Sequence, residues 1–361
     1  MRSFAYVRAG TVEEAVAEVA ADPGAAYLAG GTTQVDLMRD EVFRPARLVD
    51  ITRLPLRGIR RDGEMLIAGA LTTMEELAAH EDVTARLPLV REALLRGASP
   101  QLRHMATLGG NLLQRTRCRY YRDPSTACNK REPGAGCAAL DGHHRTHAVL
   151  GTSPHCIATH PSDLAVALLA LDASVRVHGP DGERAVRLAE FYRVPGTTPH
   201  LENALAHGEL ITHLEIPLLP PEARSGYLKV RDRASYEFAL ASVAAALVLD
   251  DGRIRSARLA LGGVGTVPWR VPRAEELLRG ARPDDDVLRA AADAALDGAE
   301  GRPDNGFKVE LGRRAVVRML GALARGEEPG GAAGDGHPGP AAGDGRPGEA
   351  GPPPRGREAG A

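Results

Sequence analysis

The sequence predicts an α+β fold with at least two domains, and three observations lead to this prediction. Near the N-terminus, strand-like and helix-like segments alternate, which is typical of a small βαβ piece. Later, two pairs of strand-like segments flank short turn sequences and indicate hairpins, so we expect a mixed sheet with helices. Helical patterns follow the second hairpin, so a C-terminal α+β domain of antiparallel strands and helices is expected.

The N-terminal piece begins with a helix signal. Thr11 precedes Glu14 by three residues, which is the pattern of a capping box, and apolar residues then recur at helical spacing. The elements expected next are a strand at 25–29, a glycine turn at 30–33, a short helix at 34–39 and a strand at 47–51. This order implies parallel pairing of the two strands.

The remaining elements follow from the same kinds of signal. A strand is expected at 65–70, then a helix capped by Thr73, and an apolar helix at 163–171. Hairpins are expected for 173–178 with 184–188 and for 239–249 with 253–261, because Asp-Gly turns separate these strands. Helices are expected at 273–279, 283–296 and 306–325.

Two breaks divide the chain. Both periodic patterns stop at the proline-rich segment 217–224, so we expect one domain at 1–220 and a second at 221–328. Residues 329–361 are rich in Gly and Pro and contain no Leu, Ile, Val, Met or aromatic residue. Such a segment cannot bury enough apolar surface to offset its ordering entropy, so a disordered tail is expected.

Composition excludes several classes of partner. The net charge is -2 and the pI is near 6.6, so no electrostatic attraction to nucleic acid is expected. No apolar stretch approaches the roughly 20 residues that a membrane helix needs, so no membrane insertion is expected. The N-terminus lacks the apolar core of a signal peptide, which favours a cytoplasmic protein without a targeting signal of its own.

Two segments with paired glycines are candidate anion sites. The first, residues 28–34, joins a strand to a helix, where glycines let backbone N–H groups approach a phosphate. The second, residues 106–112, has the same Gly-Gly pair beside Thr and Asn, so the two turns can face one diphosphate from opposite sides. Neither matches a Rossmann or Walker motif, and an ordinary turn remains an alternative for each.

All four cysteines fall in one stretch that lacks helical or strand periodicity. Cys118, Cys128, Cys137 and Cys156 have the spacing C-x9-C-x8-C-x18-C, in an insert at about 115–157. A local cluster in a large chain favours a metal or redox site over a disulfide framework. An iron–sulfur cluster, a zinc ion and unmetallated cysteines all remain open, with neighbouring histidines as rival ligands or ordinary loop residues. These histidines are His143, His144, His147, His155 and His160.

Several motifs, taken together, resemble the FAD-binding subunits of molybdopterin-dependent hydroxylases, the xanthine dehydrogenase family. They are LAGGTTQVDLM at 28–38, QLRHMATLGGNLLQ at 101–114, ATHPSDLAVALLALDA at 158–173, GELITHLEIP at 208–217 and YLKVRDRASYEFALASVAAAL at 227–247. The resemblance covers about residues 1–327 and implies a two-subdomain FAD-binding domain followed by the family's C-terminal domain. The cysteine insert is similar to that of periplasmic aldehyde oxidoreductases, which implies a [4Fe–4S] cluster on all four cysteines.

The resemblance also implies FAD contacts. Leu28, Ala29, Gly30, Gly31, Thr32, Thr33 and Gln34 would wrap the pyrophosphate, with Thr107, Gly110 and Asn111 on its other side. Asp163 would accept a hydrogen bond from a sugar or ribityl hydroxyl, and Ile211 and Lys229 would lie near the isoalloxazine ring. His104 departs from the family, which more often has Asn there. Read without the family, Asp163 can be a helix N-terminal carboxylate and Lys229 a solvated strand lysine.

The function implied is electron relay within a heterotrimer, and no catalytic residue is assigned. A large subunit with the molybdenum cofactor would oxidise an aldehyde, and a small subunit with [2Fe–2S] clusters would pass electrons to FAD here and on to an external acceptor. Alternatives are the FAD subunit of a hydroxybenzoyl-CoA reductase-like enzyme, a stand-alone flavin oxidase, or a zinc-bound scaffold. Export as a folded complex on a partner's signal, to the periplasm, is the alternative to a cytoplasmic location.

Overall fold

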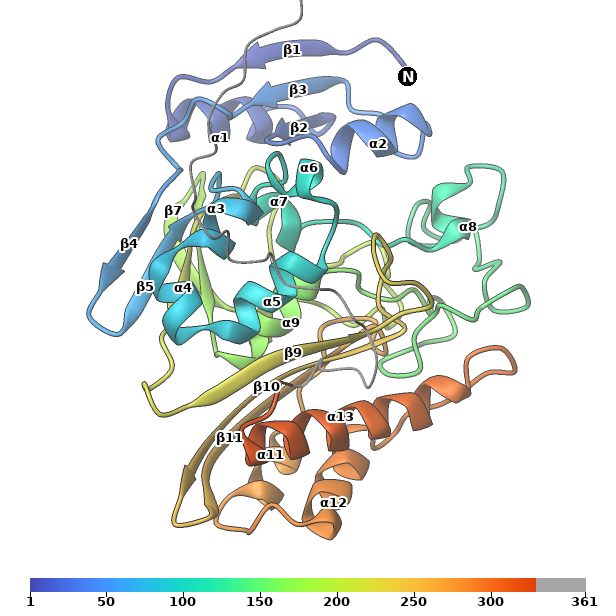
Figure 1. Ribbon diagram of the computed structural model, residues 1–361. Coiled ribbons are helices and arrows are strands. Elements are labelled where there is room, and N and C mark those ends of the chain that lie inside the picture. Colours follow the sequence, from blue (N-terminus) through green and yellow to red (C-terminus); the bar gives the residue numbers. More distant parts are fainter. Residues whose placement is uncertain (329–361) are drawn as a thin grey trace, which may run out of the picture. The chain divides into compact units, whose positions relative to one another are not determined.

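The computed structural model describes residues 1–328, which form three β-sheets with helices packed against them (Figure 1). The expected tail at 329–361 lies outside the described residues. The α+β fold class is confirmed, because one sheet is parallel, two are antiparallel and helices lie between and beside them.

The N-terminal piece is a three-stranded parallel sheet with two helices. Its elements are β1 (Ala5–Arg8), α1 (Val12–Ala20), β2 (Ala25–Leu28), α2 (Gln34–Arg39) and β3 (Arg47–Asp50). The strand order is β1-β3-β2, so the predicted parallel pairing is confirmed, while β1 was not predicted. Thr11 caps α1 by accepting from Glu14 N at 3.1 Å, but the Glu14 carboxylate accepts from Gly10 N rather than from Thr11.

The second sheet has five strands in the order β4-β5-β8-β6-β7. They are β4 (Ile59–Asp62), β5 (Met65–Gly69), β6 (Ser174–Gly179), β7 (Gly182–Arg187) and β8 (Leu210–Pro217). The hairpin of β6 and β7 confirms the prediction. Every pairing is antiparallel, so the expectation of a mixed sheet is corrected here. The central strand β8 was not predicted, although its apolar residues alternate along the chain.

Helices cover one side of this sheet and build the largest core. They are α3 (Met74–Ala79), α4 (Glu81–Arg86), α5 (Pro88–Arg96) and α9 (Asp163–Ala170), with shorter helices α6 (Pro100–Arg103), α7 (Leu108–Leu112) and α10 (Leu188–Phe191). Thr73 and Glu76 form a complete capping box at α3. Helix α9 is buried from Leu164 to Ala170 because it packs against α5 as well as against the C-terminal sheet. This position explains its apolar sequence on all sides.

The C-terminal part is an antiparallel sheet backed by helices. Its elements are β9 (Arg224–Val230), β10 (Ala241–Asp250), β11 (Arg253–Gly262), α11 (Pro272–Leu278), α12 (Asp285–Ala295) and α13 (Phe307–Arg325). The second predicted hairpin is β10 and β11, and the three predicted helices agree with α11 to α13 within two residues. In the central strand, Ala244 and Ala246 belong to the α9 core, whereas Val243, Ala245 and Leu247 belong to a second core with the late helices.

The cysteine-containing insert is irregular, as expected. Its only helix among the described residues is the four-residue α8 (Arg119–Arg122). Elsewhere it is organised by local pairing, including an antiparallel bridge between Cys128 and Cys137. One side of the insert packs on α2, where Tyr121 and Cys128 share a small apolar cluster with Leu37.

Candidate cofactor site

The first glycine segment lies directly against the second. A Cβ atom on Gly30 would come within 1.9 Å of the Met105 carbonyl oxygen, so only glycine permits this approach. Gly31 has φ +73°, a left-handed conformation that glycine adopts without strain. The two segments, far apart in sequence, therefore meet between β2 and α7, with α2 starting immediately after the first (Figure 1).

The second glycine segment differs in form from the prediction. It was expected to be a turn, but residues 108–112 form the short helix α7, and Thr107 caps it by accepting from Gly110 N at 3.3 Å. Gly109 N donates to Ala70 O at 2.9 Å, and a Cβ on Gly109 would meet the Ala70 side chain at 3.1 Å. Gly109 therefore permits close packing of α7 against Ala70, and neither glycine is in a left-handed turn.

Both glycine segments line one cavity of about 370 Å³. The predicted residues in its wall are Ala29, Gly30, Gly31, Thr32, Thr33, Gln34, Thr107, Gly110 and Ile211. The Nε2 atom of Gln34 is buried and has no hydrogen-bond partner among the described residues. A buried donor without a partner is costly, so an acceptor from a bound molecule would satisfy it.

A second cavity of about 350 Å³ lies on the other side of the same residues. Its wall includes Asn111, Asp163 and Lys229, and it shares Thr32, Thr33 and Gly110 with the first cavity. Residues from both glycine segments therefore line both cavities.

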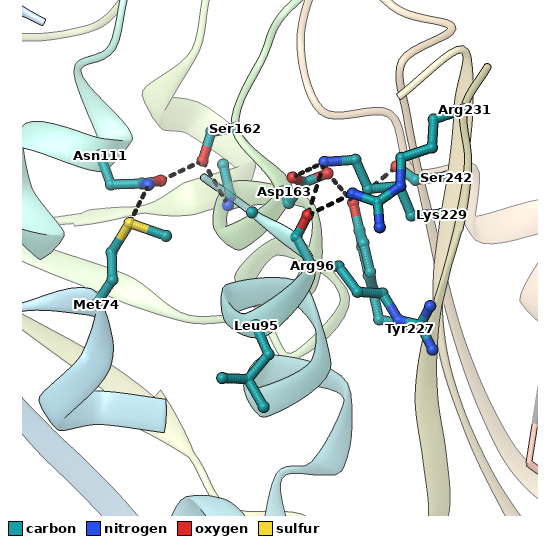
Figure 2. A network of polar contacts seen from close by, with 12 residues as sticks. Met74, Leu95, Arg96, Asn111, Ser162, Asp163, Tyr227, Lys229, Arg231 and Ser242 are labelled. Carbon is teal, nitrogen blue, oxygen red and sulfur yellow. Dashed lines mark hydrogen bonds and ion pairs between the residues drawn. The ribbon is translucent and has the colours of Figure 1, made fainter. Parts of the chain in front are cut away.

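At the wall of the second cavity, Asp163 is the centre of a buried polar network, drawn in Figure 2. Lys229 Nζ lies 2.7 Å from Asp163 Oδ2 and also donates to Arg96 O at 3.1 Å. The Tyr227 hydroxyl donates to Asp163 Oδ1 at 2.7 Å. Burial raises the pKa of Tyr227 well above its usual value, and the Asp163 carboxylate adds to the rise.

This geometry excludes one of the two readings of Lys229. Its side chain is only 2% exposed, so the solvated strand lysine is wrong. Asp163 is the first residue of α9, but Ser162 is the cap, accepting from Ala165 N at 3.0 Å. The Asp163 carboxylate is thus held by Lys229 and Tyr227 from β9. No sequence signal links these residues, because the contacts span more than sixty positions.

Asn111 is fixed by the same region of the fold. Its side-chain oxygen accepts from the Ser162 hydroxyl at 2.6 Å, and its amide nitrogen lies 3.3 Å from Met74 Sδ. The cap of α9 therefore orients the amide that lines the second cavity (Figure 2). Sequence reasoning did not single out Ser162 for this contact, although Ser immediately before a helical run is a cap signal.

Not all predicted residues come together. Ile211 lines the first cavity and Lys229 the second, so the two residues expected at one ring system lie apart. Leu28 is the last residue of β2 and lines neither cavity. His104 is exposed at the end of α6 and also lines neither cavity.

The four cysteines are all free thiols, with Cys128 and Cys156 buried and the other two half-buried. Burial raises the pKa of Cys118 to about 12, with further contributions from Cys128 and Cys156, and burial and Cys128 raise the pKa of Cys137. The thiols are therefore near enough to repel one another as thiolates. Within residues 1–328, no three His, Cys, Asp or Glu side chains converge on a point that would hold a single metal ion.

Of the five histidines near the cysteines, one contacts a thiol. His147 is buried, and its Nε2 lies 3.1 Å from Cys118 Sγ. His144 accepts from Asp304 N through Nε2 at 3.2 Å, while His143 and His155 are exposed. His160 packs edge-on against the Tyr192 ring. Sequence reasoning grouped all five as rival ligands or loop residues and missed the role of His147.

The insert is also tied to the cofactor cavities. Arg122 Nη1 lies 2.7 Å from Asp36 Oδ2 on α2, the helix that begins at the first glycine segment. Arg115 pairs with Glu202, and both residues line the first cavity. Lys130 joins the same Glu202 carboxylate at 2.7 Å. The insert and the glycine segments thus share charged contacts at one end of the site.

Comparison with known proteins agrees with this arrangement. The family model "FAD binding domain in molybdopterin dehydrogenase" matches residues 2–219, and "CO dehydrogenase flavoprotein C-terminal domain" matches residues 226–323. The chain belongs to the FAD-binding subunits of the molybdopterin dehydrogenases. It is therefore a component of an oxidoreductase, and the predicted resemblance is confirmed.

Relatives of this family match nearly the whole described chain. The aldehyde oxidoreductase FAD-binding subunit PaoB of Escherichia coli is 48% identical over 89% of this chain and 98% of its own length. The glyceraldehyde dehydrogenase medium chain of Sulfolobus acidocaldarius is 27% identical over 88% and 95%. A solved CO dehydrogenase from Oligotropha carboxidovorans matches with a TM-score of 0.71 and 25% identity, over 90% of this chain and 98% of that one.

The described part of this family member contains no helix long and apolar enough to cross a membrane.

Proposed function

We propose that FAD occupies the two joined cavities, with its pyrophosphate at the glycine segments. The observation that carries this proposal is the close contact of the segments around Gly30, together with the unpartnered Gln34 amide in the cavity wall. Backbone N–H groups at 30–34 and at the start of α7 would donate to phosphate oxygens. Asn111 and Asp163 would bind ribityl or sugar hydroxyls, because both line the second cavity.

The proposed role of the chain is electron transfer within an aldehyde-oxidising complex. FAD supplies the ability to accept electrons singly and to release them in pairs. The donors would be partner subunits with molybdenum cofactor and [2Fe–2S] clusters, and an external acceptor would take the electrons. The 48% identity to an aldehyde oxidoreductase FAD-binding subunit favours aldehydes as the substrate class of the complex. The chain's own residues bind and orient FAD and leave the organic substrate to the partner.

We also propose that Cys118, Cys128, Cys137 and Cys156 hold a [4Fe–4S] cluster. The donor set fits, because four free thiols lie in one irregular segment, where burial and the neighbouring Cys128 raise the pKa of the other three, Cys118, Cys137 and Cys156. In a four-iron cluster each thiolate binds a different iron, so the sulfurs need not converge on one point as they would around a single ion. The cluster would supply a one-electron carrier and would order the insert. A reducing cytoplasm would preserve these thiols during assembly.

The test uses the complex purified with its partner subunits. Flavin, iron and acid-labile sulfide are quantified together with an anaerobic absorbance spectrum, and about one FAD and about four irons are expected on this chain beyond those of its partners. The Cys128→Ser variant is expected to lose this chain's iron while it keeps FAD. Full iron in that variant would contradict the ligand assignment, and a colourless chain recovered without partners would contradict the function.

A further inference from the structure

Lys308, on the first turn of α13, is a buried cation that no described carboxylate neutralises. Its side chain has no solvent exposure, and its Nζ donates to three backbone carbonyls, of Thr146, His147 and Gly263. Three acceptors match the three donors of an ammonium group, whereas a neutral amine has only two. The geometry therefore corresponds to the charged form.

Burying a charge without a counter-charge is unfavourable. Burial lowers the pKa of Lys308 to about 7, and the neighbouring Arg145 contributes in the same direction. Among the described residues, the only groups that bind the ammonium are neutral carbonyls. The arrangement calls for a negative group near the segment that Lys308 contacts.

That segment leads directly to a proposed iron ligand. Lys308 Nζ lies 2.8 Å from His147 O, and the ring of the same histidine places Nε2 3.1 Å from Cys118 Sγ. In the proposed cluster Cys118 is a thiolate, which only accepts hydrogen bonds, so there Nε2 would carry the proton and donate. His147 thus contacts both groups: its backbone carbonyl binds the Lys308 ammonium, and its ring contacts the Cys118 sulfur.

A second buried side chain binds the backbone of this histidine. Asn305, also without solvent exposure, donates through Nδ2 to His147 O at 3.3 Å and to Ala148 O at 3.2 Å, and its Oδ1 accepts from Arg302 N at 2.7 Å. Asn305, in the turn before α13, and Lys308, in the first turn of α13, therefore hold residues 146–148 of the insert by hydrogen bonds. The C-terminal helix, far from the cysteines in sequence, holds the histidine against Cys118.

We infer that His147 and Lys308 set the reduction potential of the cluster on Cys118: the histidine donates to the ligand sulfur, and the lysine supplies buried positive charge. This inference rests on the proposed [4Fe–4S] cluster and deepens it. A cluster on four thiolates is anionic, and one-electron reduction adds one more negative charge. A hydrogen bond to sulfur and a nearby cation both stabilise the more negative form, so both raise the potential.

The experiment is an EPR-monitored redox titration of the intact complex, with dithionite as reductant. Lys308→Met keeps most of the unbranched side chain and removes the charge. We expect reduction to become at least tenfold less favourable, which is about 59 mV more negative for a one-electron couple. His147→Phe removes only the donor to Cys118 and is expected to make reduction of the cluster severalfold less favourable. His147→Gln keeps an amide donor, so its potential should lie between those of His147→Phe and the parent.

Arg314→Met is the matched control, because Arg314 is an exposed cation on the same helix that pairs only with Glu310 in the described chain. The reduction potential of the cluster in the Arg314→Met complex is expected to equal that of the parent. If Lys308→Met fails to load iron, His147→Phe carries the test. Unchanged potentials in iron-loaded Lys308→Met or His147→Phe complexes would overturn this inference alone, since a clamp that only supports the fold would not alter them. Absence of iron from the parent complex would overturn the cluster proposal and this inference with it.

Discussion

Lys229 Nζ lies 2.7 Å from Asp163 Oδ2, and this ion pair is almost completely removed from solvent at the wall of the second cavity. Both groups have a further partner, since Lys229 donates to Arg96 O and Asp163 accepts from Tyr227. A buried pair satisfied in this way is costly to break on one side only.

Removal of either partner is therefore expected to destabilise the protein. Lys229→Met should lower the free energy of unfolding by about 3 kcal/mol or more, because the Asp163 carboxylate would remain buried without its cation. The double variant Lys229→Met/Asp163→Asn should cost less than the sum of the single variants. Denaturant unfolding measures this, with the exposed Arg289→Met on α12 as a control that changes stability by less than about 1 kcal/mol. Additive losses would contradict the coupling.

Gly30→Ala is expected to separate the two glycine segments. The new methyl group cannot fit 1.9 Å from the Met105 carbonyl oxygen, so the backbone must move and the wall of the first cavity with it. The predicted result is loss of bound FAD, measured by flavin absorbance of the purified complex. Gly306→Ala is the control, because Gly306 has φ -56° and space for a Cβ. Retention of full flavin by Gly30→Ala would show that the segments need not touch.

Two helix caps separate stability from cofactor binding. Thr107→Ala and Thr73→Ala each remove a side-chain cap and should each cost about 1 kcal/mol of stability. Thr107 itself lines the first cavity, whereas Thr73 lines neither, so only the Thr107 variant should weaken FAD binding, by severalfold in the dissociation constant. Equal FAD affinity in the two variants would argue against a role for α7 in binding the cofactor.

The stability of the N-terminal sheet is expected to fall in acid because of Asp50. Burial alone would raise the pKa of this carboxyl, but hydrogen bonds from Tyr6, Thr52 and Arg8 lower it well below its usual value. The unfolded chain, with a pKa near ~3.9 at this position, then binds a proton more readily than the folded chain, so the contribution of Asp50 is present at neutral pH and declines as pH falls below about 4.

Unfolding free energies measured between about pH 6 and about pH 3 test this. The parent should lose stability more steeply than Asp50→Asn, because the variant has no carboxyl to protonate at this position. Parallel pH profiles for the two proteins would be inconsistent with the predicted contribution.

Local signals were enough to predict many elements from the sequence. Helix α2 has the predicted bounds of 34–39, and the hairpin of β10 and β11 follows from its Asp-Gly turn. Strand β1 was missed because four largely exposed residues show no periodicity. The paired glycines at 109–110 were interpreted as a turn because their helical conformation depends on packing against Ala70, which the local sequence does not reveal.

The site itself was only partly predictable. Both glycine segments could be named from their residues, and the structure brings them to one cavity. Two sets of contacts could not be predicted: that of Asp163 with Tyr227, and those of His147 with Cys118 and Lys308. Each joins residues from elements that meet only in the folded chain. Such contacts depend on how α9 and α13 pack against the C-terminal sheet, and a single sequence does not encode that information in any local pattern.

The strand β10 shows why the two halves of the chain are inseparable. All residues from Ala241 to Val248 are buried; Ala244 and Ala246 belong to the core around α9, and Ala241, Val243, Ala245 and Leu247 to the core with the late helices. A fragment ending before β9 would expose the apolar flank of α9, and a fragment starting there would expose one face of its own sheet. Excision of either half should therefore yield aggregates, so the two halves are expected to fold only as one polypeptide.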